Sequence, residues 1–399
     1  MISTIFFATL GPYTSNPPMP NPVAAEIASS FVHHDYSLAV RRMLDSCLDT
    51  GKEPLIREAI SWSRRYRVHE KENKGTVPPG WLEEADAFLQ QINSIAAQPV
   101  QKGVSLVEAD GISKTYTRGN FSLKRISLHV HTGDILGVVG ENGNGKTTLL
   151  RCLAGQLALD EGTLSYRLLR DNSFYAIKNH VAFIPQRIPR WYGQLKDNLH
   201  FAASIAGVTG DTNRLMVDFM LERLNLWDFA HLTWNQISSG YRTRFEIARI
   251  LLQKPHLLIL DEPLANLDIN AQQTMLTDLR FIARSAYHPM GVLLSSQQLH
   301  EVEKVADTVL FIKQGSCIFR TREDALGTEG YAFEIETTAG REQLAELLGG
   351  EAVKVHFNGG FYTITSAQRT VQQMISDLIS HQVPVTYFRD ITYSSKRFF

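Results

Sequence analysis

Hydrophobic positions in the early part of the chain recur at helical spacing. The first such run follows Asp35, has Ser37 as its candidate N-cap, and presents an apolar face made of Val40, Met43, Leu44, Cys47 and Leu48. Two further runs with this spacing span residues 55–63 and 81–92. The pattern therefore predicts a helical module over residues 35–100.

The segment ahead of this module has a different pattern. Ile2–Leu10 is apolar, but no basic segment precedes it and it is too short to span a bilayer, so it predicts neither a signal peptide nor an anchor. Prolines are dense over Gly11–Pro22, and proline at this density resists regular structure. We expect residues 1–34 to be disordered or loosely packed.

Strand-like patterns begin after residue 103 and alternate with helical ones as far as about residue 314. Such alternation is typical of an α/β fold built on a parallel sheet. Apolar runs at Ile135–Val139, Leu257–Leu260 and Val292–Leu294 have the length and composition of buried parallel strands. We place this main domain at residues 104–327.

Residues 328–399 show a βαββαβ order of patterns. The strand patterns are YAFEIET, AVKVHF, FYTITS and VPVTYF, and the helical ones are REQLAELLGG and TVQQMISDLISH. This order predicts a small split βαβ, or ferredoxin-like, α+β domain. No repeat of fixed period is present in the chain, which argues against a solenoid.

Composition narrows the functional classes. The 399 residues are 44% hydrophobic and 20% charged, which suits a chain of two or three folded domains. A net charge of -1 gives no overall basic field, so we expect no nucleic-acid partner. The three cysteines are far apart and odd in number, which fits a reducing compartment. We expect a cytoplasmic protein, and since no segment is long enough to span a bilayer, any contact with a membrane would be made through a partner.

A phosphate-binding loop follows the first buried strand, because residues 140–147 have the pattern G-x-x-x-x-G-K-T. Its glycines let backbone N–H groups surround phosphate oxygens, and the helix that starts near the lysine directs its N-terminal dipole at them. Lys146 is expected to reach the β- and γ-phosphates and Thr147 to bind Mg²⁺. The residues expected to contact the nucleotide are Gly140, Glu141, Asn142, Gly143, Asn144, Gly145, Lys146, Thr147 and Thr148.

Two carboxylates, Asp261 and Glu262, directly follow the apolar run Leu257–Leu260. Adjacent carboxylates at the end of a buried strand are costly without a cation. Asp261 is therefore expected to hold Mg²⁺ directly or through water, and Glu262 to polarise the attacking water as a general base. An exposed acidic turn is the alternative interpretation.

Taken together, these motifs resemble those of the ATP-binding cassette (ABC) ATPases over Val104 to Cys317. The resemblance is carried by GENGNGKTT, then ISSGYRTRFEIARILLQKPHLLILDEPLANLD, then SSQQL, in the family's order and spacing. It implies a P-loop α/β cassette with a RecA-like core and antiparallel β and α-helical subdomains. It also implies ATP and Mg²⁺ as ligands and ATP hydrolysis as the reaction.

The resemblance identifies Ile237–Tyr241 (ISSGY) as the signature motif, which in the family commonly is Leu-Ser-Gly-Gly-Gln. This chain keeps Ser238 and Gly240 but has Ser239 in place of one glycine and Tyr241 in place of the glutamine. The implied role of Ser238, Ser239 and Gly240, at the start of a helix, is to bind the γ-phosphate held by a second subunit.

Three more site residues come from the same resemblance. Gln186, at the end of VAFIPQ, corresponds to the glutamine that touches Mg²⁺ or the attacking water and senses the coupling partner; the alternative is a plain surface glutamine. Tyr116 corresponds to the aromatic residue that stacks on adenine, and the alternative is a half-buried strand tyrosine. Asp268 corresponds to the carboxylate that contacts the opposite subunit.

The stretch GVLLSSQQLHE, residues 291–301, departs from the family pattern. Members usually have a histidine directly after this strand, and this chain has Gln297, whose amide can donate to a phosphate oxygen but cannot carry a positive charge. His300 lies one helical turn further on and is too far to substitute. The loss of one charge-assisted contact predicts hydrolysis slower by about ten- to a hundredfold.

The sequence therefore predicts the ATP-hydrolysing subunit of an ABC transporter. A single loop and a single signature imply a second cassette, most simply in a homodimer, together with separately encoded integral membrane permease subunits. The C-terminal pattern resembles the accessory domain of some export-type cassettes and favours an exporter. The alternatives are a soluble ABC ATPase that regulates or remodels a macromolecule, and a slow cassette that pairs with a catalytic partner. The helical module has no counterpart in the resemblance; it either docks on the cassette, contacts another component or only packs.

Overall fold

The computed structural model describes residues 22–94, 103–117, 121–169, 173–265, 267–285, 288–322, 330–349 and 353–392. The chain divides into two compact units, one combining residues 1–135 with 147–295 and the other combining 136–146 with 296–399. The expected disorder of residues 1–21 lies outside the described residues. In the parts of the chain that the structure describes, no helix has both the length and the apolarity needed to cross a bilayer.

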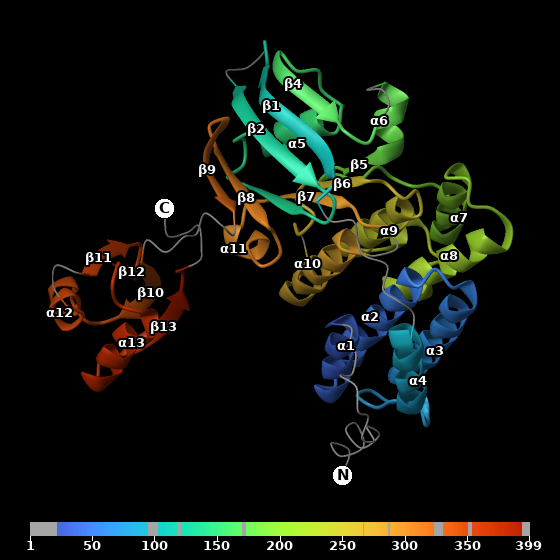
Figure 1. Cartoon of the computed structure of the whole chain (residues 1–399), viewed down its shortest axis with the longest axis horizontal. Helices are drawn as coiled ribbons and strands as arrows, with labels where there is room; N and C mark the ends of the chain where they lie inside the picture. The colour runs from blue at the N-terminus through green and yellow to red at the C-terminus, as the bar shows by residue number, and fades with distance from the viewer. Residues whose placement is uncertain are drawn as a thin grey trace, which may run out of the picture. The chain divides into compact units, whose positions relative to one another are not determined.

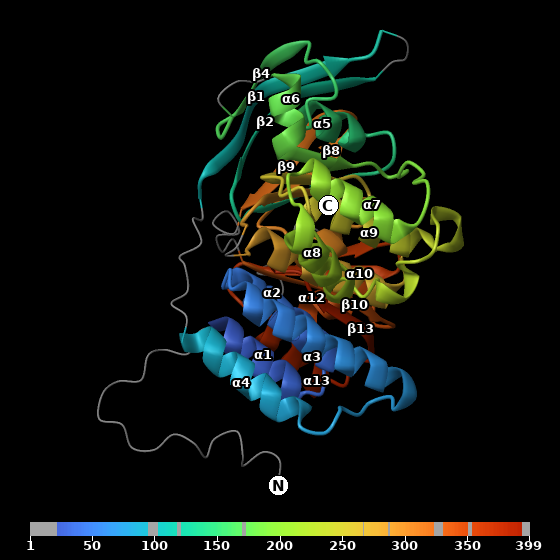
Figure 2. The same ribbon diagram turned by 90° about the vertical axis from the view of Figure 1, so that its right-hand side faces the viewer.

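Four helices lie side by side at the start of the first unit (Figures 1 and 2): α1 (Pro22–Val32), α2 (Tyr36–Asp49), α3 (Glu53–Glu72) and α4 (Trp81–Ser94). The expectation of a loosely packed segment up to residue 34 is wrong for α1, because Ile27 and Phe31 are buried. Proline is tolerated at the first position of a helix, so Pro22 opens α1 without disrupting it. The N-cap of α2 is Asp35, not Ser37, since the Asp35 carboxylate accepts a hydrogen bond from Leu38 N at 3.1 Å.

The core of this four-helix bundle is built around two tryptophans. The rings of Trp62 and Trp81 stack with centroids 4.2 Å apart and planes 2° from parallel. Each indole N–H donates to the backbone carbonyl of the other residue, at 3.1 and 3.2 Å. Burial of such large rings, with their polar atoms satisfied, gives the bundle a hydrophobic core of its own.

Two sets of strands follow in the first unit. β1 (Ser105–Thr115), β2 (Ser122–His131) and β4 (Glu161–Tyr166) form an antiparallel sheet in the order β2-β1-β4. β5 (Val181–Ile184), β6 (Leu257–Leu260) and β7 (Gly291–Ser296) pair in parallel, with Val181 opposite Leu257 and Leu257 opposite Gly291. β6 and β7 are buried along their whole length, which explains the apolar runs Leu257–Leu260 and Val292–Leu294.

The helices of the first unit connect these strands: α5 (Lys146–Leu153), α6 (Phe174–His180), α7 (Leu195–Ile205), α8 (Gly210–Arg223), α9 (Ser239–Leu251) and α10 (Ile269–Ala283). α7 packs against both α8 and α9, and these three helices lie between β5 and β6 in the sequence. They form the α-helical subdomain that the sequence predicts. α8 also packs against α2 and α3, so the N-terminal helices dock on this subdomain.

In the second unit, β3 (Ile135–Val139), β8 (Thr308–Lys313) and β9 (Ser316–Arg322) are neighbours in the order β3-β8-β9. β3 and β8 are parallel, with Leu136 opposite Thr308, whereas β9 turns back antiparallel to β8. A short helix, α11 (Leu299–Val302), precedes β8. β3 is buried at every position, as its apolar sequence predicts.

The C-terminal part of the second unit consists of β10 (Tyr331–Thr337), α12 (Arg341–Leu347), β11 (Val353–Asn358), β12 (Phe361–Ser366), α13 (Val371–Ser380) and β13 (Val385–Asp390). Its antiparallel sheet has the strand order β11-β12-β10-β13 (Figure 1). Residues of both helices and of β10, β11 and β12 share one buried apolar cluster that includes Phe333, Leu344, Ile364 and Met374. These elements follow the split βαβ order expected from the sequence.

Candidate nucleotide-binding site

The loop Gly140–Gly145 joins β3 to α5, where the phosphate-binding pattern places it. Lys146 is the first residue of α5 and is only 5% exposed. Its ammonium group donates to the carbonyl of Gly140 at 2.6 Å and to that of Glu141 at 3.2 Å. The lysine therefore lies beneath the loop, with its charge held at the place where phosphate oxygens are expected.

Glycine is required in this loop for two separate reasons. A Cβ atom at Gly140 would lie 2.3 Å from the backbone oxygen of Ile312 in β8, so the loop can approach that strand only without a side chain. Gly143 and Gly145 have φ angles of 79° and 105°, a region that residues with side chains rarely adopt. The resulting path leaves Glu141, Asn142 and Gly143 exposed to incoming ligand.

Asn144 has a role that the motif alone did not indicate. Its side-chain oxygen accepts from Gln314 N at 2.9 Å, and its backbone oxygen accepts from Gly315 N at 3.0 Å. Both partners lie in the turn between β8 and β9. Asn144 was predicted to contact nucleotide, and in this structure its side-chain oxygen fixes the loop to that turn.

Two of the three predicted metal residues, Thr147 and Asp261, meet at the carboxyl end of β6. Asp261 is 4% exposed, and its Oδ2 accepts from the Thr147 hydroxyl at 2.8 Å. Its Oδ1 accepts from the Ser295 hydroxyl at 2.8 Å. A carboxylate and a hydroxyl held this close are oxygen donors of the kind that Mg²⁺ prefers, and Mg²⁺ sites usually need only one or two carboxylates beside substrate phosphates. The residues present therefore fit the metal that the family implies, while Thr148 follows half-buried on α5.

Glu262 has an unusual backbone for its residue type. Its φ angle is 52°, in the left-handed region that costs roughly 1–2 kcal/mol for residues other than glycine. The Glu262 N–H donates to the Ser295 hydroxyl at 2.9 Å, and that same hydroxyl donates to Asp261. Ser295 thus holds both carboxylate residues in place. No role was predicted for Ser295 from the sequence, although it directly follows the apolar run Val292–Leu294; the structure buries it at the end of β7.

The signature residues lie at an exposed helix start. Ser238 is the N-cap of α9, and its hydroxyl accepts from Tyr241 N at 3.5 Å. Ser238 and Ser239 are exposed and Gly240 is half-buried, so the first turn of α9 is open to an anion. The ring of Tyr241 packs on Phe229 with centroids 3.9 Å apart. The tyrosine that replaces the family glutamine therefore has a packing role in the helical subdomain.

Gln186 lies just beyond β5 and is exposed. Gln186 lies at the same edge of the parallel strands as Asp261 and Glu262. Ile184 at the end of β5 pairs with Leu260 at the end of β6, and the Ile184 carbonyl accepts from Asp261 N at 2.9 Å. Tyr116 is 36% exposed, with its ring centroid 6.4 Å from that of Phe121. Both side chains are accessible, as a residue that contacts a ligand must be.

Asp268 caps a helix of its own chain. Its carboxylate accepts from Ala271 N at 2.9 Å at the start of α10, and the residue is exposed. Gln297 is exposed directly after β7, and the backbone N–H of the next residue, Gln298, donates to the Ser296 hydroxyl at 3.0 Å. His300 is also exposed, within α11. Gln297 thus occupies the position directly after β7 where family members usually have a histidine, and its side chain is exposed.

Comparison with known proteins adds independent evidence. The family model described as ABC transporter matches residues 123–265. An uncharacterized ABC transporter ATP-binding protein of Bacillus subtilis, YxlF, is 32% identical over 53% of this chain and 68% of its own length. The phosphonates import ATP-binding protein PhnC of Bdellovibrio bacteriovorus is 32% identical over 57% of this chain and 92% of its own length.

A solved structure shows the same fold. The structure of cbiO1 from Clostridium perfringens, part of the ABC transporter complex cbiONQ, matches with a TM-score of 0.51 and 22% identity, over 56% of this chain and 91% of that one. It confirms the predicted P-loop α/β cassette. With relatives 32% identical over most of their own length, the chain belongs to the ABC transporter ATP-binding proteins, enzymes that bind and hydrolyse ATP.

Proposed function

We propose that the chain powers separately encoded membrane-spanning subunits of an ABC transporter, and that it does so as a homodimer using ATP and Mg²⁺. The observation that carries the catalytic part is the hydrogen-bonded set of Thr147, Asp261, Ser295 and Glu262. This set joins a hydroxyl of the phosphate-binding helix to a buried carboxylate and fixes a second carboxylate beside it. It supports water activation next to a bound phosphate.

Each predicted residue has a specific task in this proposal. Lys146 and the backbone of residues 140–145 hold the phosphates, and Tyr116 stacks on the adenine. Thr147 and Asp261, assisted by Gln186, would hold Mg²⁺, which supplies neutralisation of phosphate charge when bound. Glu262 accepts a proton from the attacking water while Gln186 and Gln297 orient the reacting groups.

The dimer is proposed because the signature faces outward. Ser238, Ser239 and Asp268 are exposed, and in the family such residues complete the site of the opposite subunit. We expect phosphate release from MgATP by the purified chain to rise more steeply than linearly with protein concentration. A linear dependence over concentrations at which the chain sediments as a monomer would mean that one copy suffices and would contradict the dimer. Binding of ATP without turnover would favour the slow cassette that needs a catalytic partner.

The membrane partner and the direction of transport are also part of the proposal. We propose that the chain lies on the cytoplasmic face of the membrane and that the transporter is an exporter. The C-terminal βαββαβ domain supports export, whereas a relative with 32% identity is named as a phosphonates import protein. Purification from membranes is expected to recover integral membrane proteins with the chain. Recovery of ribosomes or other soluble macromolecules would favour the remodelling alternative.

Replacing Gln297 by histidine is expected to raise ATP turnover by about ten- to a hundredfold, because a charged donor to phosphate contributes about 1.5–3 kcal/mol. The exposed position of Gln297 leaves room for an imidazole ring. Turnover would be measured as steady-state phosphate release at saturating MgATP. The neighbouring exchange Gln298→His, also at an exposed position, is the control. Equal rates for Gln297→His and the unmodified chain would remove Gln297 from the explanation of slow hydrolysis.

A further inference from the structure

The N-terminal helices meet the cassette at a buried cluster of charges. Arg223 of α8 donates to both carboxylate oxygens of Asp45 in α2, with distances of 2.8 and 3.0 Å. It also lies 3.2 Å from the carboxylate of Asp278 in α10. Arg42 of α2 donates to Asp45 at 2.7 Å. Three helices from separate parts of the sequence are therefore joined by one set of ion pairs.

Most of this cluster is shielded from water, so each buried charge needs its ion-pair partner to offset the cost of its desolvation. The side chains of Arg42, Arg223 and Asp278 are 0%, 2% and 9% exposed, and that of Asp45, at the edge of the cluster, is 21% exposed. Burial lowers the pKa of Arg42 to about 10, against the opposing effect of Asp45, and leaves it charged near neutral pH. Burial alone would lower the pKa of Arg223 as well, but the charges of Asp278 and Asp45 raise it. Loss of either carboxylate would leave a buried guanidinium incompletely paired.

A second line of contacts holds the same surfaces together. Arg64 and Arg67 of α3 each donate to Glu222 of α8 at 3.1 Å, and the Glu222 side chain is 1% exposed. At the other helix, the Ser285 hydroxyl donates to Asp49 at 2.6 Å, next to the end of α10. The N-terminal helices thus hold both α8 and α10.

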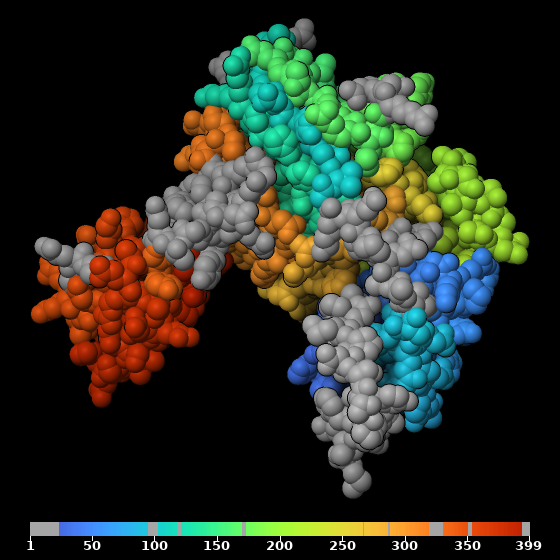
Figure 3. Space-filling model, viewed as in Figure 1, coloured from blue at the N-terminus to red at the C-terminus, as the bar shows by residue number. Residues whose placement is uncertain are grey.

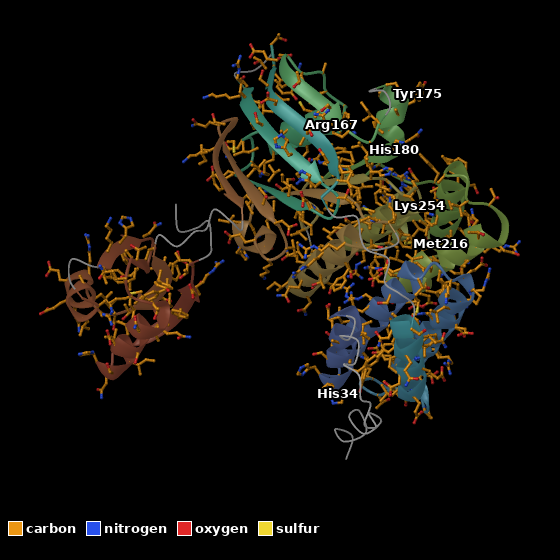
Figure 4. All side chains as sticks on the ribbon, in the orientation of Figure 1. His34, Arg167, Tyr175, His180, Met216 and Lys254 are labelled. Carbon is orange, nitrogen blue, oxygen red and sulfur yellow. The ribbon has the colours of Figure 1, made fainter. Side chains whose placement is uncertain are left out.

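The figures agree with these contacts. The blue surface of the N-terminal helices adjoins the yellow-green surface of the helical subdomain in the space-filling view (Figure 3). Met216 on α8, which is 8% exposed, lies where this helix meets the N-terminal helices (Figure 4). Buried apolar packing therefore accompanies the ion cluster at this interface.

Both of these helices lead to residues of the proposed site. α10 begins at Ile269 with Asp268 as its N-cap, shortly after Asp261 and Glu262 along the chain. α9, whose first turn carries Ser238 and Gly240, follows α8 after residues 224–238, and α7 packs against both helices. The position of α8 relative to α10 therefore affects where the signature residues lie relative to Glu262. A misplacement of about 1 Å remote from the chemistry can cost on the order of a hundredfold in rate.

We propose that the N-terminal helices act as a clamp that fixes α8 to α10, and that Asp45 is a positioning residue for ATP hydrolysis. The clamp rests on the proposed function, because it acts through the signature and Glu262. Its contribution is to hold the signature segment where a productive dimer needs it. Nucleotide binding by Lys146 and its loop does not use the clamp. Loss of the clamp is therefore expected to lower the rate of hydrolysis and to leave the affinity for ATP nearly unchanged.

The test is the exchange Asp45→Asn, which keeps the size of the side chain and removes its charge. We expect kcat for MgATP to fall by about tenfold or more, which corresponds to a rise of about 1.36 kcal/mol or more in the activation free energy. The Kd of a fluorescent ATP analogue is expected to stay within about twofold of the value for the unmodified chain. Asp45→Glu, which restores the carboxylate, is expected to recover most of kcat. The control is Asp211→Asn on α8, the helix to which Asp45 is paired, because the ion pair of Asp211 with Arg214 is about 80% exposed.

The possible results separate the clamp from the proposed function. An unchanged kcat in a folded Asp45→Asn protein would overturn the clamp, as would equal losses in Asp45→Asn and Asp211→Asn. No turnover by the unmodified chain would instead count against the proposed function. Should Asp45→Asn fail to fold, by circular dichroism and thermal unfolding, Arg67→Gln loosens the same interface at a side chain that is 13% exposed. A folded Arg67→Gln protein with full kcat would equally overturn the clamp.

Discussion

Replacing Glu262 by glutamine is expected to reduce ATP turnover by about 10²- to 10⁴-fold, the usual contribution of a general base. The change keeps the size and shape of the side chain and replaces one acceptor oxygen by an amide donor, and it leaves the backbone hydrogen bond from residue 262 to Ser295 intact. Glutamine cannot take the proton of the attacking water at neutral pH. Phosphate release at saturating MgATP measures the rate, and titration with a fluorescent ATP analogue is expected to show unchanged affinity.

The matched control is Glu342→Gln, which makes the same exchange at an exposed position of α12 in the C-terminal domain. Its turnover is expected to equal that of the unmodified chain. Hydrolysis that survives in Glu262→Gln within a few-fold would assign the proton transfer to another group. A loss of nucleotide affinity together with turnover would point to a folding defect around the strained backbone of Glu262.

The central part of the fold could be predicted because its signals are local. Leu257–Leu260 and Ile135–Val139 are buried strands with continuous apolar sequence, and the glycine pattern between β3 and α5 specifies its own geometry. The strand and helix order of the C-terminal domain follows for the same reason. Each of these inferences depends on residues that are neighbours in the chain.

The missed features depend on contacts between distant residues or on weighing one local rule against another. Asp45 and Arg223 are 178 positions apart, so one sequence gives no sign that they form an ion pair. Helix α1 was missed because proline density was given more weight than the spacing of Ile27 and Phe31. No role was predicted for Ser295, because that role depends on the left-handed backbone of Glu262, which no residue type at that position predicts.

Replacing Lys146 by alanine is expected to weaken ATP binding by about 10- to 100-fold, since hydrogen bonds to charged groups contribute about 1.5–3 kcal/mol. Turnover should fall further, because the lost charge also stabilises the transferred phosphoryl group. The exchange removes the ammonium group that lies 2.6 Å from the Gly140 carbonyl, so the loop loses an internal support together with its phosphate partner. Titration with a fluorescent ATP analogue measures the Kd.

Two companion variants identify the cause of this loss. Lys146→Arg keeps the charge but places a larger planar group beneath a loop whose carbonyl is 2.6 Å from the present nitrogen, and it is expected to bind ATP poorly as well. Lys124→Ala removes a lysine at an exposed position of β2 and should leave Kd unchanged. Normal binding by Lys146→Ala would contradict the assigned phosphate contact. Normal binding by Lys146→Arg alone would show that charge, and not the fit beneath the loop, determines the affinity of this site.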